Sequence, residues 1–357
     1  MNQFRNLAVL LGLAVLTLFA DAAAQDRGRG RGRESTPTEL EHLVYQRRSF
    51  ESPALGGRRA DYGVFVPKDL AASLEAAASD GDGEGERADG DGAAEPAKRY
   101  PLVVFLHGMF EDRDRFLERG GAPVLDRLTG DDTFPEAIFV CADGDRSSFW
   151  IDAVAEGNDY EKLVIEDLIA DVEKHYPVAK EREQRALLGV SMGGYGALKI
   201  AFRHPQKFGI VAAHSAAILP EDPDVLEERY GWLRGRGRQM LSALFGDPVD
   251  AKKWRDENVL TLSKNADAER LDGLKIYFDC GDEDRYGFED ANQELHEILE
   301  RKEIAHTWQL VEGGNHGWRS GYNQGQLPAS LRFVASQLAV RRGVSGLGGL
   351  LGGDRRK

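Results

Sequence analysis

Arg185–His204 reads RALLGVSMGGYGALKIAFRH, a stretch in which the pattern of a buried strand passes directly into the pattern of a helix. The apolar run Ala186–Val190 predicts the strand, and the apolar spacing after the turn predicts the helix. Ser191 lies at the turn, with Gly189 and Gly193 two residues away on either side. A turn this tight strains the serine backbone and leaves little room beside it, so the pattern predicts a nucleophile elbow.

Two backbone N–H groups are expected beside this serine. The helix that follows Ser191 directs its first N–H groups and the positive end of its dipole toward the turn, so Met192 is the first candidate oxyanion donor. The run Leu102–Leu106 reads LVVFL and predicts a buried strand that leads into His107 and Gly108. In many serine hydrolases a strand followed by His-Gly supplies the second donor, here the N–H of Met109.

Strand patterns alternate with helix patterns after residue 100. This alternation predicts an α/β fold with a mostly parallel sheet that helices cover on both faces. In such sheets functional groups gather at the carboxyl ends of the strands. Four candidate residues follow predicted strands in this way: His107, Ser191, Asp284 and His316.

Three of these residues form a candidate catalytic triad. A serine hydroxyl needs a base to take its proton, and the base needs an acceptor that fixes its tautomer. Ser191, Asp284 and His316 occur in the chain order of α/β-hydrolase triads. Asp279 and Asp282 compete for the acid position, but the first lies inside the predicted strand and the second follows the glycine turn directly.

Three further side chains lie in loops at the same edge and are expected to contact substrate: Trp150, His107 and Trp318. Trp150 has a structural alternative, because a loop aromatic also packs into a core. His107 is expected to brace its loop rather than to act as a base. The predicted helical excursion 217–271 follows the elbow region and is expected either to cover the site as a cap or to form a rigid layer.

The sequence divides into a leader, one folded domain and several segments without an apolar face. The leader resembles a signal peptide, with Arg5, an apolar stretch and a small-residue exit that predicts cleavage after Ala24. The predicted parts are 1–24 signal peptide, 25–39 flexible Arg-Gly linker, 40–341 folded domain with a disordered acidic insertion at 71–98, and 342–357 flexible tail. A periplasmic or secreted protein without stable membrane insertion is therefore expected.

The net charge bears on possible binding partners, and the positions of the two cysteines bear on a possible disulfide. The net charge of −14 disfavours nucleic acid as a partner. Cys141 and Cys280 lie on predicted strands with three others between them, a separation of about 19 Å at about 4.8 Å per strand. A disulfide needs Cα atoms within about 7 Å, so two buried free thiols are expected. The candidate chemistry needs no metal and no organic cofactor.

The motifs VVFLHGMFED, LLGVSMGGYGALKIAFRHPQKF, YFDCGDED and GGNHGW resemble the putative esterase family of α/β-hydrolases. This family includes esterase D, feruloyl-esterase-type carbohydrate esterases and the antigen 85 mycolyltransferases. The resemblance implies the α/β-hydrolase fold and an active serine esterase. It also implies Asp284 as the acid, because the family pattern G-x-x-D falls on Gly281 and Asp284.

The favoured function is an exported serine carboxylesterase that acts on small-molecule or carbohydrate esters. An acyltransferase with the same triad, an S-formylglutathione hydrolase-like thioesterase and a catalytically inactive binding relative are the alternatives. The resemblance disfavours the thioesterase, because those enzymes carry a Ser-Gly-Leu-Thr-Cys type loop where this chain has Leu106–Met109. The sequence gives no indication of an oligomeric state.

Overall fold

The computed structural model describes residues 39–80, 98–226, 236–267, 269–318 and 324–339. The chain divides into two units, Met1–Glu39 and Leu40–Lys357, and the features below belong to the second. The predicted signal peptide, residues 25–38 of the Arg-Gly linker and the C-terminal tail lie outside the described residues, as do positions 81–97 of the predicted insertion.

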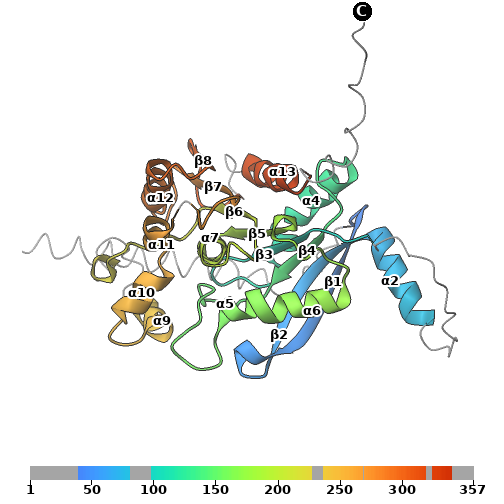
Figure 1. Ribbon diagram of the computed structural model, residues 1–357, viewed down its shortest axis with the longest axis horizontal. Helices are drawn as coiled ribbons and strands as arrows, with labels where there is room; N and C mark the ends of the chain where they lie inside the picture. The colour runs from blue at the N-terminus through green and yellow to red at the C-terminus, as the bar shows by residue number, and fades with distance from the viewer. Residues whose placement is uncertain (1–38, 81–97, 227–235, 268, 319–323, 340–357) are drawn as a thin grey trace, which may run out of the picture. The chain divides into compact units, whose positions relative to one another are not determined.

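An eight-stranded sheet forms the centre of the second unit, in the order β1-β2-β4-β3-β5-β6-β7-β8 (Figure 1). The strands from β3 to β8 run parallel to one another, whereas β2 is antiparallel to both its neighbours. The mostly parallel sheet predicted from the sequence is therefore confirmed. The strand bounds are β1 (Leu43–Ser52), β2 (Arg58–Pro67), β3 (Leu102–Leu106), β4 (Ile138–Ala142), β5 (Arg185–Val190), β6 (Ile210–His214), β7 (Lys275–Gly281) and β8 (His306–Val311).

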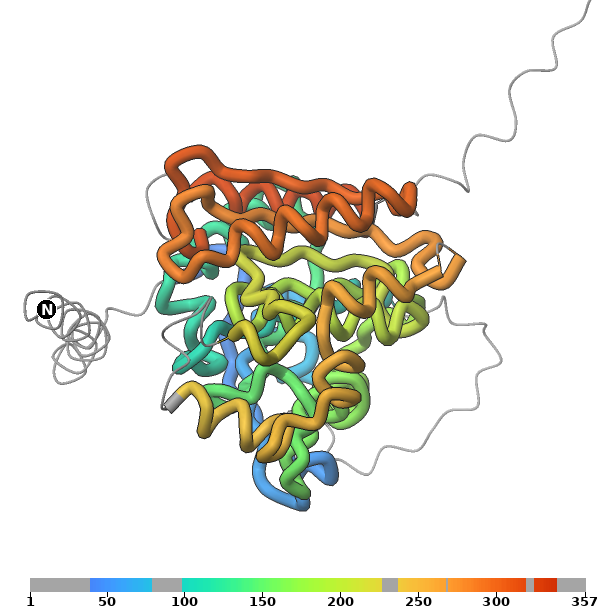
Figure 2. The backbone as a smooth tube through the Cα atoms, turned by 90° about the vertical axis from the view of Figure 1, so that its left-hand side faces the viewer, coloured from blue at the N-terminus to red at the C-terminus, as the bar shows by residue number. Residues whose placement is uncertain are grey.

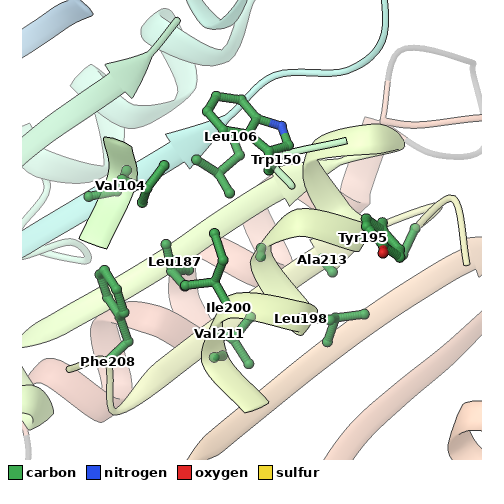
Figure 3. Close-up of a cluster of buried hydrophobic side chains, with 14 of the residues drawn as sticks. Val104, Leu106, Trp150, Leu187, Tyr195, Leu198, Ile200, Phe208, Val211 and Ala213 are labelled. Atoms are coloured by element: carbon green, nitrogen blue, oxygen red, sulfur yellow. The ribbon is translucent and has the colours of Figure 1, made fainter. Parts of the chain in front are cut away.

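Helices cover both faces of this sheet (Figure 1). Neighbouring residues of a strand point to opposite faces, so Val104 belongs to the core beneath α7 and Phe105 to the core beneath α4 and α13. Figure 3 shows α7 packed on the sheet, with Ile200 near Leu187 and Val211. The helix bounds are η1 (Pro53–Leu55), α2 (Lys68–Asp80), α3 (Arg115–Glu118), α4 (Gly121–Gly130), α5 (Tyr160–Lys162), η2 (Leu163–Leu168), α6 (Ile169–His175), η3 (Arg182–Gln184), α7 (Met192–Arg203), η4 (Pro223–Val225), α9 (Arg236–Phe245), α10 (Ala251–Glu257), α11 (Val259–Asn265), α12 (Glu289–Arg301) and α13 (Gln326–Ala339).

The acidic insertion begins later than the sequence suggested. Residues 71–80 were expected to be disordered, but they belong to the helix α2. Leu70 and Ala71 in its first turn are buried against the core. The alanine-rich composition that seemed too polar to pack is also a strong helix former, and two buried residues suffice to anchor the helix.

The two cysteines are free and buried, as predicted. Cys141 lies on β4 and Cys280 on β7, and the strands β3, β5 and β6 separate them. Sheet order alone therefore keeps the two thiols apart.

The excursion 217–271 is mostly helical over its described residues, as predicted. Its helix α11 packs against the elbow helix α7, and α10 packs against α11 (Figures 1 and 2). Buried ion pairs connect this region to α7. Lys199 on α7 is fully buried, and its Nζ lies 2.7 Å from a carboxylate oxygen of Glu257 on α10 and 2.7 Å from one of Glu161 on α5.

Lys199 also donates a hydrogen bond to the carbonyl oxygen of Trp150 at 2.7 Å. Burial by itself lowers the pKa of Lys199, but the carboxylates of Glu161 and Glu257 raise it above its ordinary value. Lys199 is therefore a cation that joins α5, α7, α10 and the loop of Trp150.

Replacing Lys199 by alanine should lower the free energy of unfolding by about 3 kcal/mol, the low end of the cost of breaking a buried ion pair. Glu161 and Glu257 would lose their fully buried cation and keep Arg203, whose side chain is 31% exposed. Denaturant unfolding followed by circular dichroism measures this. The matched control is Lys252→Ala, since the side chain of Lys252 is 80% exposed in an ion pair on α10 and such pairs contribute about 0–1 kcal/mol. Equal losses in the two variants would contradict the anchoring role of Lys199.

Candidate active site

Ser191 lies in a strained turn between β5 and α7. Its φ and ψ are 56° and −118°, in the left-handed half of conformational space that residues with a side chain rarely adopt. Such a residue costs about 1–3 kcal/mol and persists only where its surroundings hold it. Here the N–H of Ser191 donates to the carbonyl of His214 at 2.9 Å, and the carbonyl of Ser191 accepts from Tyr195 and Ala217 at 3.0 Å each.

The glycines on either side of the turn allow close backbone contacts. A Cβ on Gly189 would lie 2.1 Å from the carbonyl oxygen of Gly193, and a Cβ on Gly193 would lie 1.9 Å from that of Leu106. Both positions therefore exclude a side chain, as the pattern around Ser191 predicted. The second contact also brings the start of α7 against the end of β3.

Asp284 and His316 meet beyond the ends of β7 and β8. Nδ1 of His316 lies 2.7 Å from Oδ2 of Asp284, so this ring nitrogen donates to the carboxylate and leaves Nε2 as the acceptor. The side chain of Asp284 is fully buried, while that of His316 is 11% exposed. The histidine thus keeps an accessible edge, and its tautomer is the one that can take a proton at Nε2.

Asp284 is held as an anion. Its Oδ1 accepts from the N–H of Tyr286 at 2.9 Å, and the thiol of Cys280 lies 3.6 Å from its Oδ2. Burial by itself raises the pKa of Asp284, but the hydrogen bond and charge of His316, together with these two donors, hold the pKa below its ordinary value. The carboxylate is therefore charged at neutral pH and stabilises positive charge on the ring of His316.

The competing acids lie elsewhere. Asp282 is exposed. Asp279 is buried and accepts from Nδ1 of His214 at 2.8 Å, and Nε2 of His214 lies 2.9 Å from Oγ of Ser330. Sequence reasoning missed this second Ser-His-Asp row, whose residues belong to β6, β7 and α13. All three side chains are buried, so the row joins elements of the core and offers no access to a substrate.

The loop of His316 lies against the elbow strand. The N–H of Gly317 donates to Oγ of Ser215 at 2.9 Å, and a Cβ on Gly317 would lie 3.4 Å from Cγ2 of Val190. The ring of Tyr286 meets the ring of His316 edge to face, with centroids 4.6 Å apart. Within the described ranges the Ser191 hydroxyl makes no hydrogen bond, and active-site hydrogen bonds often tighten only when substrate binds.

The loop after β3 lies on the other side of Ser191. A Cβ on Gly108 would lie 3.5 Å from the Cβ of Ser191. The N–H groups of Gly108, Phe110 and Glu111 each have an acceptor. Among the described residues no acceptor meets the N–H of Met109. The N–H of Met192 belongs to the first turn of α7, where N–H groups have no partner within the helix.

The three side chains that were predicted to contact substrate are buried. His107 and Trp150 are both 0% exposed, and Trp318 is 7% exposed. The indole N–H of Trp150 donates to the carbonyl of His107 at 3.3 Å. Trp318 packs against Phe105 on the opposite face of the sheet. The core packing considered for Trp150 and the loop bracing expected for His107 agree with this burial. Trp318 is buried as well, so none of the three offers much surface to a substrate.

His107 braces the loop through both ring nitrogens. Its Nε2 accepts from the N–H of Gly144 at 3.0 Å, so Nδ1 carries the proton and donates to the carbonyl of Gly108 at 2.8 Å. Burial lowers the pKa of His107, which keeps the ring neutral.

The described ranges show neither a metal-binding cluster nor a membrane-spanning helix. They contain no cluster of three His, Cys, Asp or Glu residues that could bind a metal ion. None of their helices combines the length and the apolar character that crossing a bilayer requires.

Comparison with known proteins gives a consistent group of relatives. The model of the family described as "Putative esterase" matches residues 92–333. An acetyl esterase of Caldicellulosiruptor saccharolyticus is 28% identical over 179 residues, which are 48% of this chain and 63% of that protein. An endo-1,4-beta-xylanase/feruloyl esterase of Xylanibacter ruminicola is 30% identical over 115 residues, or 31% of this chain and 16% of that protein.

Each of these two matches spans less than two thirds of the relative's own length. Among solved structures, a ferulic acid esterase superposes with a TM-score of 0.63 at 25% identity, covering 83% of this chain and 99% of that one. The α/β-hydrolase fold that the family resemblance implied is therefore confirmed.

Proposed function

The chain belongs to the putative esterase family, and we propose that it is a serine carboxylesterase that forms an acyl-enzyme on Ser191. The hydrogen bond between Asp284 and His316, formed beyond the ends of two neighbouring strands, is the observation that carries the proposal. It leaves His316 Nε2 able to accept a proton. The strained turn of Ser191 at the end of β5 supports the same assignment.

The first half of the reaction transfers the acyl group to the serine. Oγ of Ser191 attacks the ester carbonyl carbon while Nε2 of His316 takes the hydroxyl proton. Asp284 stabilises the resulting imidazolium. The N–H groups of Met109 and Met192 bind the oxyanion of the tetrahedral intermediate. The intermediate collapses when the bond to the alcohol oxygen breaks, and His316 gives its proton to the departing alcohol.

The second half releases the acid. Water gives a proton to Nε2 of His316 and attacks the acyl carbon, which forms a second oxyanion in the same pair of N–H groups. The bond to Oγ of Ser191 then breaks, and the proton returns from His316 to the serine. One ester and one water give one alcohol and one carboxylic acid, with the protein unchanged and no metal or organic cofactor used.

The proposed substrates are short acyl or feruloyl esters of small alcohols or carbohydrates. The printed activities of the acetyl and feruloyl esterase relatives support this class. Phe110, which follows Met109, is 60% exposed. An exposed aromatic ring beside the oxyanion loop suits a sugar or an aromatic acyl group. Export to the periplasm or the medium is part of the proposal and rests on residues 1–24.

A panel of acetyl, butyryl and feruloyl esters tests the proposed function. We expect turnover of at least the short p-nitrophenyl esters, with a rate that EDTA does not change, because the mechanism needs no metal. Product analysis with added alcohols or sugars separates hydrolysis from acyl transfer. No turnover of any ester by folded protein, or loss of turnover on chelation, would contradict the proposal.

A further inference from the structure

Glu111 lies directly behind the oxyanion loop and contacts Gly108 twice. Its Oε2 accepts from the N–H of Gly108 at 2.9 Å, and its own N–H donates to the carbonyl of Gly108 at 3.3 Å. The side chain of Glu111 is 10% exposed. One glutamate therefore fixes both polar groups of the residue that precedes Met109.

These contacts set the direction of the Met109 N–H. The carbonyl of Gly108 accepts from Glu111 and also from Nδ1 of His107 at 2.8 Å. In a trans peptide the C=O and the following N–H point in opposite directions, and the described residues have their one cis peptide at Asp247–Pro248. Holding the Gly108 carbonyl on one side therefore directs the Met109 N–H to the other.

A bare carboxylate at this place would oppose the reaction, because it would repel the oxyanion that forms on the substrate. Two guanidinium groups compensate it. Nε of Arg115 and a terminal nitrogen of Arg119 each lie 2.8 Å from Oε1 of Glu111. Burial by itself raises the pKa of Glu111, but the charges of Arg119 and Arg115 hold it below its ordinary value. The Glu111 carboxylate therefore accepts the hydrogen bond from Gly108 while Arg115 and Arg119 balance its negative charge.

We propose that Glu111 is a positioning residue for the reaction: by holding Gly108 it aims the Met109 N–H at the oxyanion. This inference rests on the proposed function. The side chain itself does not touch the reacting atoms. One carboxylate oxygen of Glu111 accepts from Gly108, and the other contacts the two arginines. The length of the side chain and its negative charge can therefore be tested by different substitutions.

Glu111→Asp keeps the charge and shortens the reach, whereas Glu111→Gln keeps the reach and removes the charge. Loss of a whole oxyanion donor costs about 10²–10³ in kcat. We therefore expect Glu111→Asp to lower kcat for p-nitrophenyl acetate about tenfold or more with KM within about twofold, and Glu111→Gln to stay within about threefold in kcat. The matched control is Glu118→Ala, which removes an exposed carboxylate 3.1 Å from Arg115 and leaves Gly108 untouched.

Inhibition by a trifluoromethyl ketone distinguishes this role from a purely structural one. The inhibitor adds to the serine and forms an oxyanion, so its binding depends on the oxyanion donors. Its inhibition constant should rise in Glu111→Asp by the factor by which kcat/KM falls. Thermal melting identifies which variants fold, and the kinetics of each folded variant test the proposal independently. Wild-type kcat in Glu111→Asp, a loss beyond tenfold in Glu111→Gln, or an equal loss in Glu118→Ala would overturn the proposal. Lack of turnover by the unmodified protein would instead reject the proposed function.

Discussion

Replacing Ser191 by alanine should lower kcat for p-nitrophenyl acetate by a factor on the order of 10⁶, as expected when a triad nucleophile is removed. The substitution deletes the one oxygen that the proposed mechanism uses to form the acyl-enzyme. Folding should survive, because no hydrogen bond of the Ser191 hydroxyl exists within the described ranges and the backbone contacts of the turn remain. Initial rates at saturating ester, together with a melting curve, measure both effects.

Ser336→Ala is the control for this substitution. Ser336 is an exposed serine on α13 whose hydroxyl donates only to a carbonyl of its own helix. Its variant should keep the wild-type rate. A folded Ser191→Ala protein that retains more than about a thousandth of the wild-type kcat would show that another group forms the covalent intermediate.

Replacing Asp284 by asparagine should lower kcat by about 10⁴-fold with little change in fold. The carboxylate accepts the Nδ1 proton of His316. An amide NH₂ group in that place would stabilise the tautomer that carries its proton on Nε2, which cannot accept the proton of Ser191. The loss should appear in kcat for p-nitrophenyl acetate while the melting temperature stays close to that of the wild type.

The same measurement distinguishes Asp284 from Asp282, the nearby alternative for the acid of the triad. Asp282→Asn changes an exposed side chain two residues earlier and should leave kcat within about twofold of the wild type. A 10⁴-fold loss in Asp282→Asn, or a loss below tenfold in folded Asp284→Asn, would contradict the assignment of the acid.

Much of this fold was predictable because its information is local. The apolar run Leu102–Leu106 predicted β3 with the bounds that the structure has. The glycines around Ser191 predicted a close turn, and both are positions where a side chain would collide with backbone. The chain order of Ser191, Asp284 and His316 then placed candidate residues at strand ends, since parallel strands end at one edge of the sheet.

Contacts between distant segments were not predictable in this way. The row of Asp279, His214 and Ser330 forms only because β6, β7 and α13 are neighbours in the fold. The burial of Trp150 depends on Gly196, where a Cβ would lie 2.7 Å from the indole. Glu111 lies in the segment VVFLHGMFED, but the sequence assigned it no role, because that role depends on how the loop returns toward Gly108.

Local rules also failed where two of them compete. Residues 71–80 combine polar and alanine-rich character, and helix propensity with two anchoring residues prevailed over the expectation of disorder. The helical segment 160–175 is α-helical only at its ends, because Leu163–Leu168 form a π-helical turn between α5 and α6. The apolar spacing of that segment carries no signal for the wider turn.

The most direct test of the central claim is to locate a fluorophosphonate adduct by tandem mass spectrometry of a tryptic digest. Cleavage after Arg185 and Lys199 releases the peptide ALLGVSMGGYGALK, in which Ser191 is the single serine. We predict one phosphonyl group on that serine in the folded protein and none after unfolding. An adduct on a different residue, or an unlabelled folded protein, would contradict the account.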